Sequence, residues 1–214
     1  MSALAATSLF NAADESTPGH YPPSQTAFLL LDFHSMFVGM ANGPTAIRLV
    51  EVAAKMRTWA KEQGIQVIHC LMDTDSTPFP TCKDASMFAS IVTALKSNGG
   101  EEPAELLQGG GDDITFTRRA GYVSALRSPG LEEFLKKKGI KSLVLAGLST
   151  SGCVLRTAVT ASDAEYVVSV ISDACADQSQ DVHDMMVGAV IKSRAYVTTG
   201  AEFQEGFTKC HAGK

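Results

Sequence analysis

The chain has 214 residues, of which 45% are hydrophobic and 19% are charged, and its net charge at pH 7 is −5. This length suits one globular domain with its own core. The acidic balance argues against the basic surface that binds nucleic acid. Five unevenly spaced cysteines disfavour a disulfide framework and favour a reducing compartment.

Residues 1–24 contain several prolines and no clear period, so we expect an extended arm there and one domain over residues 25–214. The arm lacks the basic and apolar segments of a signal peptide. No apolar run approaches the roughly 20 residues that span a bilayer. We therefore expect a cytoplasmic protein that does not contact membranes.

The first half of the chain alternates apolar runs with helical spacing. The continuous apolar run 26–31 is typical of a strand buried on both faces. The pattern next predicts a helix over 44–63, a strand over 65–72 and a helix over 85–96. The glycine-rich stretch 98–111 predicts an acidic surface loop.

The second half repeats this alternation more regularly. It predicts strands over 113–117, 142–146, 166–171 and 195–198, and helices over 130–138, 152–163 and 180–193. Such a pattern is typical of an α/β protein. We expect a three-layer α/β/α, Rossmann-like fold around a mostly parallel six-stranded sheet.

Reactive side chains follow three of the predicted strands. Asp32 follows the first strand, Arg118 the strand over 113–117, and Cys153 comes a few residues after 142–146. Ligands of open parallel sheets bind beyond the carboxyl ends of the strands, so an acid, a cation and a thiol should face one edge. Each residue alone has a plainer interpretation, namely a turn former, a surface ion pair or an inert core thiol.

Cys153 falls near the first turn of a predicted helix. There the helix dipole and the free N–H groups would lower the thiol pKa. The same N–H groups would hold a developing oxyanion. A neighbouring carboxylate can take the thiol proton and later deliver it to a leaving group.

Three segments together resemble one known family. They are FLLLDFHSMF at 28–37, LVLAGLSTSGCVLRTA at 143–158 and SVISDA at 169–174. Over about residues 25–205 the sequence resembles the isochorismatase-like cysteine hydrolases, a superfamily that includes nicotinamidases, N-carbamoylsarcosine amidases and isochorismatases.

The resemblance implies roles for individual residues. Cys153 corresponds to the nucleophile and Asp32 to the acid/base. The bond between Leu148 and Ser149 corresponds to the family's cis peptide, which directs the Ser149 N–H and the Cys153 N–H into an oxyanion hole. Phe37 matches an aromatic position that lines the substrate pocket.

Two residues depart from the family pattern in the expected pocket. Arg118 stands where the family has a catalytic lysine; arginine keeps the positive charge but cannot give up its proton. It can stabilise the Cys153 thiolate or hold a substrate carboxylate. His34 stands where the family has glutamine, and we expect it to be a pocket-wall or structural residue.

The metal ligands of nicotinamidases are missing. The corresponding stretch, 71–78, contains Asp73 and Asp75 but no histidine, and two aspartates alone are weak ligands for a zinc-type site. His69 lies before the strand end and is interpreted as structural. We therefore expect no metal and no cofactor.

Three functions stay open on this sequence. The first is hydrolysis of a C–N bond in a small amide through a thioester on Cys153. The second is vinyl ether hydrolysis of the isochorismatase type, with Asp32 as the acid and Arg118 favouring a carboxylated substrate. The third is a non-catalytic binding protein that has lost the lysine. The expected partner is a small molecule, and the helical faces and low net charge favour a homo-oligomer.

Overall fold

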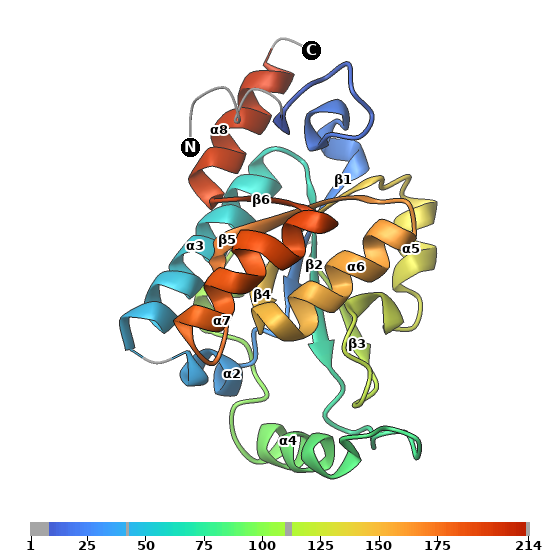
Figure 1. Cartoon of the computed structure of the whole chain (residues 1–214), viewed down its shortest axis with the longest axis vertical. Coiled ribbons are helices and arrows are strands. Elements are labelled where there is room, and N and C mark those ends of the chain that lie inside the picture. Colours follow the sequence, from blue (N-terminus) through green and yellow to red (C-terminus); the bar gives the residue numbers. More distant parts are fainter. Residues whose placement is uncertain (1–8, 42, 110–112, 213–214) are drawn as a thin grey trace.

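A computed structural model describes residues 9–41, 43–109 and 113–212. It contains a six-stranded sheet in the order β3-β2-β1-β4-β5-β6, and every neighbouring pair is parallel. Helices cover both faces of this sheet, which confirms the predicted three-layer α/β/α fold (Figure 1). The strands are β1 (Thr26–Leu31), β2 (Gln66–Met72), β3 (Ile114–Arg118), β4 (Ser142–Leu148), β5 (Val167–Ala176) and β6 (Tyr196–Thr198).

The central strands β1 and β4 consist entirely of buried residues, as their continuous apolar sequences predict. Leu31, the last residue of β1, is in register with Gly147 of β4 and Cys70 of β2. The three strands therefore end close to one another. The residues that follow them meet at the carboxyl edge of the sheet, where open α/β sheets bind ligands.

Helices α3 (Gly43–Glu62) and α8 (Gly200–His211) pack on one face of the sheet. Phe203 and Phe207 of α8 are fully buried, and both make edge contacts with the ring of Trp59 on α3. Full burial of such a side chain stabilises a fold by about 1.5–3 kcal/mol, which is enough to hold a short helix in place. The sequence pattern did not predict α8.

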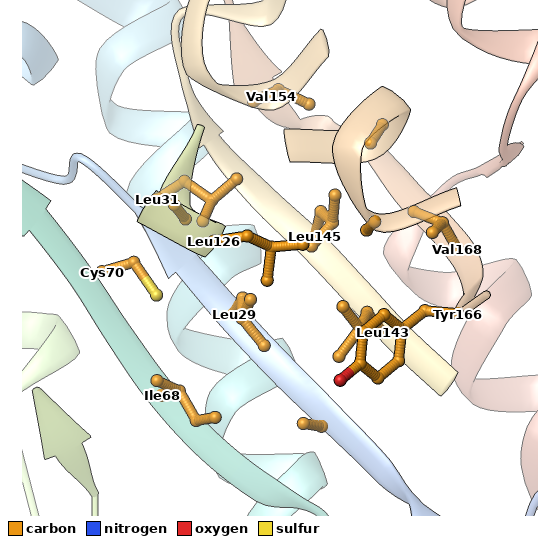
Figure 2. Close-up of a cluster of buried hydrophobic side chains, with 14 of the residues drawn as sticks. Leu29, Leu31, Ile68, Cys70, Leu126, Leu143, Leu145, Val154, Tyr166 and Val168 are labelled. Atoms are coloured by element: carbon orange, nitrogen blue, oxygen red, sulfur yellow. The ribbon is translucent and has the colours of Figure 1, made fainter. Parts of the chain in front are cut away.

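The opposite face packs against α5 (Leu131–Lys137) and α6 (Leu155–Asp163). Alternate residues of the central strands, such as Leu29 and Leu145, point into this second core, together with Val154 at the start of α6 (Figure 2). The strand alternation thus divides the apolar residues between two cores on either side of the sheet.

Three more helices are α2 (Ser35–Met40), α4 (Ala85–Ser97) and α7 (Gln180–Met185). Helix α4 projects from the body of the molecule beyond the carboxyl end of β2 (Figure 1). The helix predicted over 180–193 is confirmed, and its winding changes along its length, because α7 continues as a π-helical turn at 186–190 and a 3-10 turn at 191–193. Helix α2 was not predicted.

The arm expected over residues 1–24 is not extended where the structure describes it, over residues 9–24. Residues 1–8 lie outside the described part. Two single-turn 3-10 helices occupy Pro18–His20 and Pro23–Gln25. Phe10 packs edge-on against Phe203 of α8, with ring centroids 5.4 Å apart. The arm therefore folds back on α8 because its aromatic residue finds an apolar partner there.

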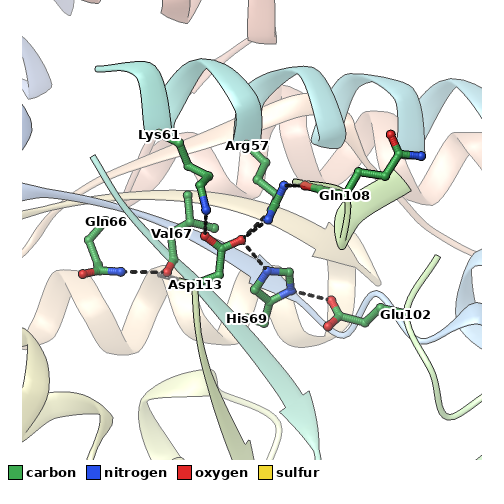
Figure 3. Close-up of polar contacts among 8 residues, drawn as sticks. All are labelled: Arg57, Lys61, Gln66, Val67, His69, Glu102, Gln108 and Asp113. Carbon is green, nitrogen blue, oxygen red and sulfur yellow. Dashed lines mark hydrogen bonds and ion pairs between the residues drawn. The ribbon is translucent and has the colours of Figure 1, made fainter. Parts of the chain in front are cut away.

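The predicted acidic surface loop is also wrong in part. Leu106 is fully buried, and the Glu102 side chain is only 6% exposed. The Glu102 carboxylate lies 2.7 Å from Nδ1 of His69, inside a cluster of charged side chains that ties the loop to α3 and the sheet (Figure 3). The glycines at 110–111 lie outside the described residues. Within the described ranges, no helix is long and apolar enough to cross a membrane.

Candidate active site

Asp32 is the first residue after β1, and its side chain is 5% exposed. Its backbone φ is 54°, in the left-handed region that aspartate tolerates better than most residues. The Asp32 N–H donates to the carbonyl of Cys70 at 2.9 Å, which continues the sheet by one bond. This turn ends the strand and places the carboxylate just beyond the sheet edge.

Arg118 ends β3 and forms a fork-like pair with Asp32. Its Nη1 and Nη2 atoms donate to the two carboxylate oxygens at 2.8 and 2.5 Å, and its Nε donates to the carbonyl of Tyr122 at 3.0 Å. Burial lowers the pKa of Arg118, but the charge of Asp32, its hydrogen bonds and the nearby thiols of Cys153 and Cys70 together more than offset this, so the pKa is raised and the guanidinium stays charged. Both terminal nitrogens of the Arg118 guanidinium are therefore bonded to Asp32.

Cys153 lies in a wide turn, Thr150–Val154, that joins β4 to α6. Two glycines, one at the end of β4 and one in the turn, allow close approaches on either side of Ser149. At Gly147, with φ of 155°, an added Cβ would lie 2.2 Å from the carbonyl oxygen of Leu31, and at Gly152 it would lie 2.6 Å from the Ser149 hydroxyl oxygen. The small residues of this segment are thus a steric requirement for bringing the thiol to the sheet edge.

The thiol of Cys153 is buried, and burial raises its pKa to about 12. Arg118 and a hydrogen bond with Thr157 lower the pKa, whereas the charge of Asp32 and a hydrogen bond with it raise it. The low pKa predicted for Cys153 is therefore wrong. The cause is that Cys153 loses its solvation, while the positive charge of Arg118 is already paired with a carboxylate.

The turn around Cys153 is held by side chains that the sequence pattern did not single out. The Asp177 carboxylate accepts a hydrogen bond from the Ser151 N–H at 2.5 Å, and Nδ1 of His183 lies 2.9 Å from the Thr150 hydroxyl. Asp177 directly follows β5, so its place at a strand end was a signal that could have found it. The peptide bond between Leu148 and Ser149 is cis.

A cavity of about 510 Å³ opens onto these groups. Asp32, Arg118 and Cys153 all line it, and so do Ser149 and Gly152. Most of the other residues that line the cavity are apolar. The apolar lining residues include Phe37, Met40, Met72, Met87, Phe88, Ile91, Val123 and Leu148.

Phe37 thus lines the cavity, whereas His34 does not, and its contacts fit the second of its two interpretations, that of a structural residue. His34 is buried behind Phe37, whose ring centroid is 5.6 Å away. Its Nδ1 bonds to the carbonyl of Gly100 at 2.7 Å, and its Nε2 accepts from the Met72 N–H at 3.1 Å. Both ring nitrogens are used by the backbone, so His34 joins α2, β2 and the loop after α4.

No group of three or more His, Cys, Asp or Glu side chains in the described ranges is arranged to hold a metal ion. Asp75 pairs with Lys96 at 2.6 Å, and Asp73 accepts a bond from the backbone of Asp75. The side chains that converge on the cavity offer a thiol, a carboxylate and a guanidinium. These groups can perform nucleophilic attack with proton transfer.

This arrangement agrees with comparison to known families. The sequence model of the isochorismatase domain matches residues 26–202. The chain belongs to the isochorismatase family. It is therefore an isochorismatase-family hydrolase by descent, and the candidate site occupies the carboxyl edge of its sheet.

Individual relatives are more distant. A protein of Arabidopsis thaliana named as a probable inactive nicotinamidase is 28% identical, over 74% of this chain and 84% of its own length. A maleamate amidohydrolase of Pseudomonas putida is 24% identical, over 74% of this chain and 75% of its own. The crystal structure of a cysteine hydrolase from Pseudomonas syringae superposes with a TM-score of 0.76 at 19% identity, covering 89% of this chain and 96% of the other. The similarity between this chain and the Pseudomonas syringae protein concerns the fold alone.

Proposed function

We propose that this isochorismatase-family member hydrolyses a C–N bond of a small amide through a thioester on Cys153. The observation that carries the proposal is that Cys153, Asp32 and Arg118, from three separate strand ends, line one cavity. The similarity to an amidohydrolase supports the choice of a C–N bond.

In the proposed reaction, the Cys153 sulfur attacks the amide carbonyl while its proton passes to Asp32. The backbone N–H groups of Ser149 and Cys153 are the proposed donors to the oxyanion. Asp32 then gives its proton to the leaving nitrogen, and the C–N bond breaks to leave a thioester. Water attacks the thioester with Asp32 as base, which releases the acid and restores the thiol.

The raised pKa of Cys153 decides the timing of proton transfer. Because the pKa is about 12, the resting sulfur carries its proton at neutral pH. Asp32 must therefore remove the proton as the sulfur attacks. A carboxylate has about four lone-pair sites, so two bonds from Arg118 leave capacity for this proton.

Arg118 has an electrostatic part in this scheme. It pairs with the Asp32 carboxylate in the resting site and then faces the charge that moves onto the sulfur and oxygen. It does not transfer protons, because its pKa lies above about 12. Since the fork is committed to Asp32, Arg118 is not available for a substrate carboxylate, which weakens the vinyl ether alternative.

A non-catalytic binding protein is the second candidate. The pairing of Asp32 with Arg118 also favours this candidate. If Asp32 could not accept the Cys153 proton while paired with Arg118, the protonated thiol would not react. One relative is itself named as an inactive nicotinamidase. The two candidates differ in whether a covalent intermediate forms on Cys153.

Rapid acid quenching followed by intact-mass spectrometry separates these candidates. With a panel of small amides, we expect an acyl adduct on the wild type that is absent from Cys153→Ala. The matched control is Cys175→Ala, which removes another buried thiol of raised pKa that does not line the cavity. Turnover that survives Cys153→Ala would exclude the thioester. Tight binding of amides without any adduct or turnover would support the non-catalytic candidate.

A further inference from the structure

One face of α4 forms part of the wall of the cavity that also contains the thiol. Met87, Phe88 and Ile91 all line the cavity, and their spacing puts them on the same side of the helix. Phe37 and Met72 continue this surface from α2 and the end of β2. A ligand that reaches the thiol therefore presents its far end to methionine, isoleucine and phenylalanine side chains.

Several of these side chains are partly exposed to solvent. Met87 is 49% exposed and Met40, also in the wall, is 57% exposed. Apolar surface of this kind gains free energy when a ligand covers it. Methionine side chains are flexible and fit apolar groups of varied shape. The wall therefore suits apolar substituents of several shapes, not one particular ring or chain.

The charges that line the cavity oppose an anionic ligand. Among the described lining residues, the carboxylates are Asp32, Asp84 and Asp177, and the guanidiniums are Arg118 and Arg156. Arg118 is paired with Asp32 through both oxygens. Arg156 and Asp84 are both exposed, so water and salt screen their charges, and outside the Asp32 pair the partly buried carboxylate of Asp177 is the least screened charge of the lining.

We propose that the substrate class is an uncharged amide with an apolar substituent, such as an aryl or branched alkyl group. The amide carbonyl faces Cys153 and the substituent packs against Met87, Phe88 and Ile91. This inference rests on the proposed amide hydrolysis for its reacting end. The cavity of about 510 Å³ lies within the range of about 300–1,000 Å³ that is usual for small-molecule sites.

Binding of three matched amides to full-length Cys153→Ser tests the proposal without chemistry. The ligands are acetamide, phenylacetamide and the para-carboxylated analogue of phenylacetamide, each titrated calorimetrically at pH 7. We expect phenylacetamide to bind at least about tenfold more tightly than acetamide, since even small apolar groups contribute about 10–200-fold in such pockets. The carboxylated analogue should bind at least about tenfold more weakly than phenylacetamide, because it adds a like charge to a site with excess carboxylates.

Variants in the Cys153→Ser background locate the substituent. Phe88→Ala should weaken phenylacetamide binding at least about fivefold and leave acetamide unchanged. Ile47→Ala, at a residue that is 63% exposed and does not line the cavity, should stay within about twofold. Equal affinity for acetamide and phenylacetamide, or tighter binding of the carboxylated analogue, would overturn the proposal.

The outcomes also separate this inference from the proposed function. If Cys153→Ser prefers phenylacetamide but the wild type turns over none of the amides, the substrate-class inference stands and the thioester mechanism falls. If the wild type forms acyl adducts with carboxylated amides and not with apolar ones, the mechanism stands and the inference falls.

Discussion

Two of the arginine–carboxylate pairs among the described residues have little exposure, and they differ in what surrounds them. Arg118 and Asp32 face a cavity and a thiol. Arg57 of α3 pairs with Asp113 in a closed cluster, where Arg57 also donates to the carbonyl of Gln108 at 2.7 Å. Figure 3 shows this second pair surrounded by further polar partners.

Every charge of the second cluster has a partner. Lys61 donates to Asp113 at 2.6 Å, and His69 lies between Asp113 and Glu102, at 3.5 and 2.7 Å. These contacts join α3, the start of β3, the middle of β2 and the loop after α4. The cluster therefore fixes the segment that carries α4, and with it the apolar wall of the cavity.

The comparison shows that burial and pairing alone do not identify a catalytic site. Both pairs have short bonds and little exposure. Only the Asp32 pair adjoins a nucleophile with a space into which a substrate fits. We therefore expect loss of Arg118 to lower both rate and stability, and loss of Arg57 to lower stability alone.

The largest effect is expected for Arg118→Ala. Loss of one electrostatic group of this kind typically lowers kcat by about 10²–10³-fold, and here Asp32 is also left buried without its partner. The Cys153 pKa should rise further, because Arg118 lowers it in the wild type. The measurements are kcat on the active amide and the pH dependence of Cys153 alkylation.

Arg119→Ala is the matched control for that variant. Arg119 is the next residue along the chain, is exposed, and donates to the carbonyls of Thr77 and Pro78. Its removal should leave kcat and the thiol titration unchanged. If Arg118→Ala behaved like Arg119→Ala, Arg118 would have no part in catalysis.

Arg57→Ala should give the next largest effect, on stability. Removing one partner of a buried ion pair typically costs about 3–5 kcal/mol, because the remaining charge is left unpaired. Urea unfolding measures the loss, and Arg48→Ala, at an exposed position of the same helix, is the control. We expect kcat per folded molecule to stay near the wild-type value. A hundredfold loss of kcat without loss of stability would reverse the distinction between the two pairs.

A change of pH should have a smaller effect, on the free energy of unfolding. The contribution of Asp113 should be lost at acid pH and that of Cys153 at alkaline pH. Burial raises the pKa of Asp113, but Lys61 and Arg57 more than offset this and lower it. The stabilisation from Asp113 is therefore present above the unfolded pKa of 3.8 and is lost as the pH falls through the folded value. For Cys153 the pKa rises from 9.0 to about 12, so its contribution is present below pH 9 and is lost as the pH rises toward 12.

Thermal unfolding across pH checks these signs. Asp113→Asn should be less stable than the wild type at pH 7, and the difference should shrink at acid pH. Cys153→Ala should lose less stability than the wild type between pH 9 and 12. A Cys153→Ala difference that appeared at acid pH instead would show that the thiol pKa is lowered in the fold.

The sequence predicted the parts of the site that depend on short segments. The apolar run before Asp32 gave β1, and the strand followed by small residues predicted the turn that carries Cys153. The order of strands also predicted that Asp32, Arg118 and Cys153 would meet at one edge, because parallel strands end on the same side. Interpretation of His69 as structural agrees with its place in the closed cluster.

The remaining features depend on contacts between distant segments. The thiol pKa follows from burial under α6 and from the pairing of Arg118 with Asp32, neither of which has a local signal. Burial of Glu102 likewise needs His69, which lies 33 residues away. Helix α8 did have a local signal, since Thr199 and Glu202 form a capping box with the expected spacing.

The smallest effect is expected for Arg118→Lys, which asks whether the site needs the charge or the fork. Lysine keeps a positive charge on a flexible stem but offers a single ammonium, so it cannot hold both Asp32 oxygens in the paired geometry of Arg118. It would also lose the bond to the Tyr122 carbonyl. If charge is what stabilises Asp32 and the developing oxyanion, kcat should stay within about tenfold of the wild type, or about 1.4 kcal/mol in barrier height. Measurement of kcat and KM over pH 6–9 on the same amide gives the answer. Activity as low as that of Arg118→Ala would mean that the planar fork itself positions Asp32 against the thiol, and that this chain has come to depend on arginine at the end of β3.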